Sequence, residues 1–238
     1  MTASPLSLET VFQIGPVPIT QPVVVTFGIV VAAALSACLL QRHLALRPGK
    51  VQAFVELVVS AIDHQISDVM QGDPAPYRAL IGTIFLFVLL ANWSSLVPGI
   101  EPPTAHLETD TALALIVLVA TVYFGISKRG LRAYLRTFAQ PTWVMIPLNV
   151  VEQLTRTFSL VVRLFGNVMS GVFVIGIVAS LAGLLVPIPL MALDLLTGLV
   201  QAYIFAVLAM VFITAAVETG KVRGTEPGSA NSPTEKDT

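Results

Sequence analysis

The stretch RTFSLVVRLFGNVMSG, residues 156–171, decides how the rest of the sequence is interpreted. It lies within an apolar run that reaches from about residue 142 to residue 186, and Arg163 has no charged residue within six positions on either side. A cation at the middle of a bilayer costs about 2.5–3.5 kcal/mol on insertion scales, so such a residue usually serves a function. Because no acid in this run can easily pair with Arg163, we expect its partner on another chain or in a water-filled cavity.

The composition indicates a membrane protein. Of the 238 residues, 55% are hydrophobic and 11% are charged, whereas soluble domains carry about 25% charged residues. The net charge of −1 gives no indication of a nucleic-acid partner. We expect one membrane domain over residues 1–219 and a disordered cytoplasmic tail over residues 220–238, where the sequence is polar.

Hydrophobic runs predict an all-α, polytopic membrane protein with five transmembrane helices. A helix needs about 20 apolar residues to cross a bilayer, and the last two runs are longer, so we expect both helices to be strongly tilted. Residues 50–70 place apolar side chains at helical spacing among charged ones, which predicts an amphipathic helix on the cytoplasmic side. The five predicted spans are residues 22–41, 79–97, 111–127, 142–186 and 190–217.

The distribution of charge predicts the orientation of the chain. Basic residues cluster after the first span, at residues 42–50, and after the third span, at residues 127–136. The loop over residues 101–110 holds three acids and neither Lys nor Arg. Because cytoplasmic loops are enriched in Lys and Arg, we expect the N-terminus outside and the C-terminus in the cytoplasm.

Polar side chains recur on one face of each of the last two spans. Four residues make slightly more than one helical turn and seven make nearly two, so Ser159, Arg163 and Asn167, each four residues apart, lie roughly on one side of their helix. Asp194 and Gln201 share a side of the next helix. Such a stripe could line an ion path, or its Ser, Asn and Gln could serve only as hydrogen-bonding contacts between helices.

At these residues the sequence resembles a known family. Residues 159–171, SLVVRLFGNVMSG, look like the signature of subunit a of F-type rotary ATP synthases, and residues 200–205, VQAYIF, resemble the second signature of that family. Asn92 followed by Leu-Val-Pro at residues 96–98, and Pro-Thr-Ala at residues 103–105, match further family positions. The resemblance covers roughly residues 20–218.

The resemblance implies a stator subunit of a bacterial plasma (inner) membrane that holds two offset aqueous half-channels against a rotating ring of c subunits. Arg163 would then face the essential carboxylate of the ring and keep the half-channels from being short-circuited. Other implied partners are the b-type subunits of the peripheral stalk. The subunit would be non-catalytic, with no cofactor, because the nucleotide chemistry is on other subunits. The resemblance leaves open whether protons or sodium ions move.

The sequence departs from the family pattern at the external side of the path. Many relatives carry Glu where Val172 stands, and here Asp194 supplies an acid one helix later, so we assign Asp194 to the external channel. His106 and Glu108 replace Asp and Asn of relatives and form either the channel mouth or a plain solvated loop. These departures also hint at a branch of the family that pumps ions by ATP hydrolysis, in some complexes sodium.

Two other classes of protein fit the sequence less well. A stand-alone ion channel or secondary transporter remains the alternative, but transporters usually show internal repeats, and none is visible here. An intramembrane enzyme would need a catalytic cluster such as His-Glu-x-x-His or Gly-x-Ser-x-Gly. The three histidines are instead scattered over flanks and loops, at positions 43, 64 and 106.

Overall fold

The computed structural model describes residues 10–14, 17–42, 49–97, 100–132, 145–182 and 186–218. Five of its helices are long and apolar enough to cross a membrane, which confirms the all-α membrane fold. These five helices are α1 (Gln21–Arg42), α3 (Ala75–Trp93), α4 (Leu107–Arg129), α6 (Met145–Ala182) and α7 (Pro187–Glu218). The predicted tail over residues 220–238 lies outside the described residues and stays a prediction.

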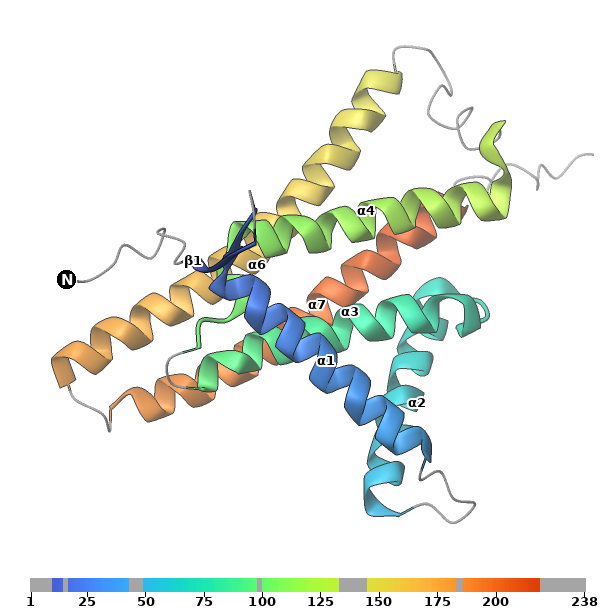
Figure 1. Cartoon of the computed structure of the whole chain (residues 1–238). Coiled ribbons are helices and arrows are strands. Elements are labelled where there is room, and N and C mark those ends of the chain that lie inside the picture. Colours follow the sequence, from blue (N-terminus) through green and yellow to red (C-terminus); the bar gives the residue numbers. More distant parts are fainter. Residues whose placement is uncertain are drawn as a thin grey trace, which may run out of the picture.

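The core is formed where α3, α4 and α6 pack around α7 (Figure 1). The large side chains of Ile81, Leu164 and Phe205 are almost fully buried there. On α7 the small residues Ala202 and Ala209 are fully buried as well. In a membrane the hydrophobic effect does not drive helices together, so close packing of small residues becomes a main source of stability.

Helix α1 is peripheral to this core. No residue of its most apolar 18-residue window is buried, and in Figure 1 it crosses in front of α3. Its side chains Phe27, Leu35 and Leu39 are all more than half exposed. An apolar helix with so little protein around it is suited to contact lipid or a partner helix.

Helices α6 and α7 are the longest elements, with 38 and 32 residues. At 1.5 Å per residue α6 extends for about 57 Å, roughly twice the thickness of the hydrocarbon core. Figure 1 shows that its first part, in yellow, and its last part, in orange, run in different directions. The prediction that these two helices are too long to stand upright in a bilayer therefore agrees with their observed lengths.

Helix α2 (Lys50–Met70) lies across the end of α3 and is not apolar enough to be a candidate span (Figure 1). Ile66 and Met70 near its end are buried in the core. Phe54, an apolar side chain near the start of α2, is 65% exposed. Only the C-terminal half of the predicted amphipathic face therefore packs on the rest of the chain.

Two boundaries differ from the predicted spans by one helical turn each. Helix α3 begins at Ala75, which brings Arg78 inside the helix, where its Nε donates a 2.5 Å hydrogen bond to Asp63 of α2. Helix α4 begins at Leu107, so residues 107–110 are its first turn and the prediction of a loop there is wrong. Short 3-10 turns, η1 (Ser94–Leu96) and η2 (Pro103–Ala105), lie between the two helices.

A short β-hairpin precedes α1 and was not predicted. Strand β1 (Thr10–Ile14) pairs antiparallel with β2 (Val17–Thr20), with Thr10 opposite Thr20 and Ile14 opposite Val17. Isolated two-stranded hairpins are only marginally stable, and β2 also contacts α1. The hairpin adds a feature at the N-terminus without changing the helical membrane domain.

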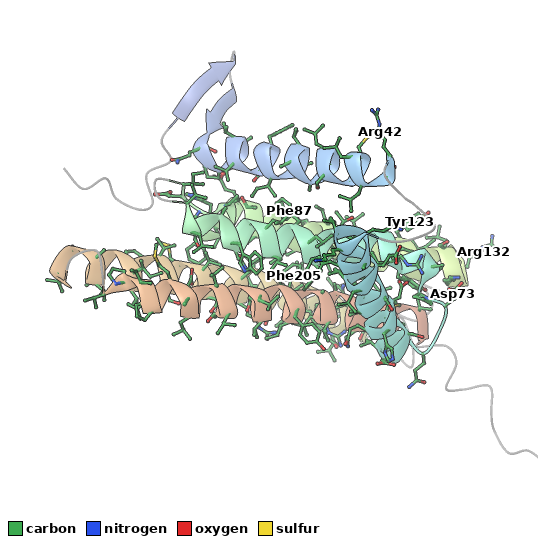
Figure 2. All side chains as sticks on the ribbon, turned by 90° about the horizontal axis from the view of Figure 1, so that it is seen from below. Arg42, Asp73, Phe87, Tyr123, Arg132 and Phe205 are labelled. Atoms are coloured by element: carbon green, nitrogen blue, oxygen red, sulfur yellow. The ribbon has the colours of Figure 1, made fainter. Side chains whose placement is uncertain are left out.

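Charged residues gather at one end of the helices. Figure 2 shows Arg42, Asp73 and Arg132 at the same end, whereas Phe87 and Phe205 lie along the middle and the hairpin lies at the opposite end. The chain therefore has an apolar centre flanked by a charged end, as a membrane-spanning bundle requires.

Candidate functional site

Arg163 lies on the side of α6 that faces away from the core. Leu160, Leu164 and Val168, on a different face of the helix, are buried, and Arg163 itself is exposed. Among the residues that the structure describes, none forms a hydrogen bond or ion pair with the guanidinium. The described part of this chain therefore supplies no hydrogen-bond or ion-pair partner for Arg163.

The exposed face of α6 around Arg163 includes several small residues. Ser159, Gly166 and Ser170 are exposed on the same side as Arg163. A Cβ atom added at Gly166 would meet nothing within 4 Å. The structure thus places Ser159 and Arg163 together, on a surface that a neighbouring helix could approach closely.

Asn167 and Asp194 line a common pocket between α6 and α7. The pocket has a volume of about 190 Å³, and Ser170, Gly171 and Thr197 contribute further to its wall. Both Asn167 and Asp194 are half-buried. A pocket of this size has room for several water molecules, and its polar groups offer hydrogen bonds to them.

The carboxyl group of Asp194 is held by contacts with two other elements. Ser95 of η1 donates a hydrogen bond from Oγ to Asp194 Oδ2, at 3.2 Å. On the other side the carboxyl packs directly against Gly171, because a Cβ atom added there would overlap Asp194 Oδ1. Sequence reasoning missed Ser95, whose contact joins positions 99 residues apart.

Asn92 links three elements by hydrogen bonds. Its Nδ2 donates to the backbone carbonyl of Gly198 on α7, at 3.1 Å, and its Oδ1 accepts from Thr104 Oγ1 of η2, at 2.7 Å. Asn92 and Thr104 are both buried. A Cβ atom added at Gly198 would lie 3.0 Å from the Asn92 Cβ, so the absence of a side chain there permits this close approach.

Gln201 is buried on α7, with 6% of its surface exposed. Its Nε2 has no hydrogen-bond partner among the described residues. Gln201 lies seven positions after Asp194 in the same helix, which places it nearly two turns further along. A buried amide nitrogen without a partner is suited to bind water or a group from another chain.

His106 and Glu108 differ in their surroundings. His106 is the residue before α4, and its side chain is 13% exposed with Nε2 at 3.3 Å from Glu101 Oε2. Glu108 is exposed in the first turn of α4. The structure therefore brings His106, but not Glu108, into the protein interior.

Two acids that the sequence analysis did not single out also occupy notable positions. Glu152 forms an ion pair with Arg156 on α6, and the Arg156 guanidinium carbon lies 5.5 Å from the centre of the Phe212 ring on α7. Asp110 is fully buried in the first turn of α4. The sequence carried no signal of this burial, because an acid directly before the apolar run of a membrane helix is costly to bury and is expected at the surface.

No three His, Cys, Asp or Glu side chains come together as metal ligands within the described part of the chain. The fold and the polar groups between its helices define a polytopic membrane protein with half-buried and buried hydrogen-bonding residues along α6 and α7. This class includes proteins that move ions or small polar solutes through a bilayer.

Comparison with known proteins narrows this class. The family model described as ATP synthase A chain matches residues 23–214. ATP synthase subunit a 2 of Bradyrhizobium sp. (strain BTAi1 / ATCC BAA-1182) is 54% identical over 91% of this chain and 97% of its own length. ATP synthase subunit a of Albidiferax ferrireducens is 43% identical over 92% and 96% of the two chains. The chain belongs to the ATP synthase subunit a family, which confirms the resemblance noted in its sequence.

Proposed function

We propose that this chain is the ion-translocating stator subunit of an F-type ATP synthase in a bacterial plasma (inner) membrane. Its family and its five apolar helices support this role. The observation that carries the proposal is the exposed Arg163, without a partner in the described residues, on a face of α6 that includes the small residues Ser159, Gly166 and Ser170. A stand-alone channel or transporter would leave this cation unpaired against lipid, at a considerable cost.

In this proposal the partner of Arg163 is a carboxylate on a rotating ring of c subunits. An arginine close to a carboxylate favours its ionised form, so each ring subunit would release its ion as it passes Arg163. The guanidinium would also block direct flow between two half-channels that open to opposite sides of the membrane. Each unit charge that crosses 100 mV supplies about 2.3 kcal/mol, so several ions per nucleotide are needed to drive ATP synthesis.

The outward-facing half-channel would run through the pocket between α6 and α7. Asp194 and Asn167 line this pocket, and Asn92 holds α7 in place beside it. His106 would lie at the channel mouth, with the exposed Glu108 at its rim. Gln201, two turns beyond Asp194, would bind water or ring groups near the level of Arg163.

The remaining assignments follow from the same role. The subunit would contact the c-subunit ring, b-type subunits of the peripheral stalk and lipid, and it would bind neither nucleotide nor nucleic acid. It would be non-catalytic itself. The end marked by Arg42 and Arg132 would face the cytoplasm, in agreement with the positive-inside rule, and the N-terminus would lie outside. The transported ion would be a proton or sodium.

The experiment replaces Arg163 in the complete ATP synthase complex. Inverted membrane vesicles are tested for ATP-driven uptake of protons, with a pH-sensitive dye, and of radioactive sodium. Arg163→Ala should abolish uptake of the transported ion while the complex still assembles and hydrolyses ATP. Arg42→Ala, at the end of α1, is the matched control and should transport normally. Coupled transport at the wild-type rate in Arg163→Ala would refute the proposed role.

A further inference from the structure

The carboxyl group of Asp110 is buried without a partner. No part of the residue is exposed, and neither Oδ1 nor Oδ2 has a hydrogen-bond partner among the described residues. Its backbone is regular, since the Asp110 N–H donates to the carbonyl of His106 at 3.3 Å. Most buried polar groups in proteins are hydrogen-bonded, so a carboxyl with two free oxygens calls for an unseen water or ion.

A buried ring nitrogen belongs to His106, the residue directly before α4. His106 Nε2 is buried and lies 3.3 Å from Glu101 Oε2, without the alignment of a hydrogen bond. His106 is the residue before α4 and Asp110 is the fourth residue of that helix, and the backbone hydrogen bond from Asp110 to the His106 carbonyl brings the two residues into contact. The two carboxyl oxygens of Asp110 thus remain without a partner among the described residues, and a buried water typically needs two to four such polar partners.

Burial of the side chains increases from Glu101 through His106 to Asp110. The Glu101 side chain is 57% exposed and its Oε2 lies 3.3 Å from His106 Nε2. Exposure falls to 13% at the His106 side chain and to zero at Asp110. The first turn of a helix also favours a negative charge, because backbone N–H groups there point toward it. Asp110 therefore lies in a helical turn that favours a negative charge, four residues after a side chain that contacts an exposed acid.

We propose that Asp110 is an additional station on the outward-facing ion path of this subunit. Its carboxylate would exchange a monovalent cation, either H⁺ or Na⁺, with water that enters past Glu101 and His106. This station is on α4, whereas the Asp194 carboxyl is on α7 and is held by Ser95 and Gly171. The inference rests on the proposed function, because it assigns a residue to the path that this function requires.

The first test replaces the carboxyl by an amide of the same shape in the complete complex. Asp110→Asn should lower ATP-driven ion uptake into inverted vesicles by about tenfold, since positioned proton-transfer groups contribute rate factors of this order or larger. Asp110→Glu should retain most of the transport. Thr111→Ala is the matched control at the next position, because its Oγ1 only donates to the Leu107 carbonyl of the same helix, and it should transport normally.

The second test measures access of water to position 110. In a Cys38→Ala background, which removes the single cysteine of the chain, Asp110→Cys should react with the small cationic reagent 2-aminoethyl methanethiosulfonate. Leu113→Cys, which is buried on the same helix, should not react. This readout does not depend on transport, so it remains available even where a variant is inactive.

The outcomes separate this inference from the proposed function. Wild-type uptake in Asp110→Asn, or a Cys at position 110 that the reagent never reaches, would overturn the role of Asp110. If Arg163→Ala abolishes uptake in the same experiments, only the inference about Asp110 fails. If Arg163→Ala transports normally, the proposed function fails as a whole.

Discussion

Arg163 and Asp194 lie on neighbouring helices but have opposite surroundings. Asp194 is half-buried, accepts a hydrogen bond from Ser95 and packs on Gly171. Arg163 is exposed and has no partner within the described residues. The Asp194 carboxyl thus has partners within the described residues, whereas the Arg163 guanidinium has none there, and in the proposed function its partner is on another chain. The two helices differ in the same way. In the most apolar 18-residue window of α7, 39% of the residues are buried, compared with 11% in that of α6.

Among the following predictions, the largest effect is expected when an amide replaces the Asp194 carboxyl. Asp194→Asn should lower ATP-driven ion uptake by about tenfold, because the carboxyl is the only acid lining the pocket between α6 and α7 among the described residues. Uptake by vesicles that contain the assembled complex is the measurement.

The contact with Gly171 provides a control for this prediction. Because the Asp194 carboxyl occupies the space where a Gly171 side chain would begin, Asp194→Gly combined with Gly171→Asp places a carboxyl in nearly the same position from the other helix. The double variant should recover part of the uptake that Asp194→Asn loses. Equal inactivity of the two would show that the acid is needed on α7 itself, and normal uptake in Asp194→Asn would remove Asp194 from the path.

A smaller effect is expected when the acid is displaced and not removed. Gly171→Ala adds a methyl group that overlaps the Asp194 carboxyl, so the side chain must shift and uptake should fall by about threefold. Gly28→Ala on α1 is the matched control, since a Cβ atom there meets nothing within 4 Å. Equal uptake by both variants would mean that the position of the Asp194 carboxyl does not matter.

The next prediction concerns the hydrogen bonds that position α7. Asn92→Ala removes two of them and leaves Thr104 and the Gly198 carbonyl without this partner. The free energy of unfolding should fall by about 1–2 kcal/mol, measured as a lower midpoint of thermal unfolding in detergent. Thr83→Ala on the same helix loses only a bond to the Ala79 carbonyl one turn away and should unfold near the wild-type temperature. If both variants unfold together, Asn92 does not hold α7.

The smallest effect is expected at Ser159, which is exposed beside Arg163 on α6. Ser159→Ala keeps the surface small and should change uptake by less than about twofold, because single hydrogen bonds of Ser in membrane helices contribute little. Ser159→Phe introduces a large side chain and should lower uptake much more if another helix slides along this face. Normal uptake in Ser159→Phe would indicate that the face contacts lipid.

The helices and the isolated arginine could be predicted from the sequence because each leaves a local signal. Runs of apolar residues mark a span, and Arg163 is conspicuous because charged residues are absent around it. The Ser95–Asp194 hydrogen bond and the Asn92–Gly198 contact could not be predicted, since they join positions that are 99 and 106 residues apart. The paired residues contain no local pattern that would indicate such distant contacts.

Errors at the helix ends have a different physical origin. Glu108 and Asp110 are polar and were assigned to a loop, but acids in the first turn of a helix are stabilised by its free N–H groups, so α4 begins at Leu107. A prediction from polarity alone therefore placed the start of α4 too late in the sequence. The hairpin at residues 10–20 was missed because its pairing depends on two short segments that carry no strong alternation.

The most direct test of the open arginine site asks which carboxylate lies next to position 163. In the complete complex, Arg163→Lys supplies an amine that a membrane-permeable carbodiimide can join to a carboxylate in contact with it, and mass spectrometry of the product identifies the joined residue. The account predicts an amide bond to a carboxylate of a small ring subunit. An amide bond to Asp194, Glu152 or any other acid of the same chain would contradict it.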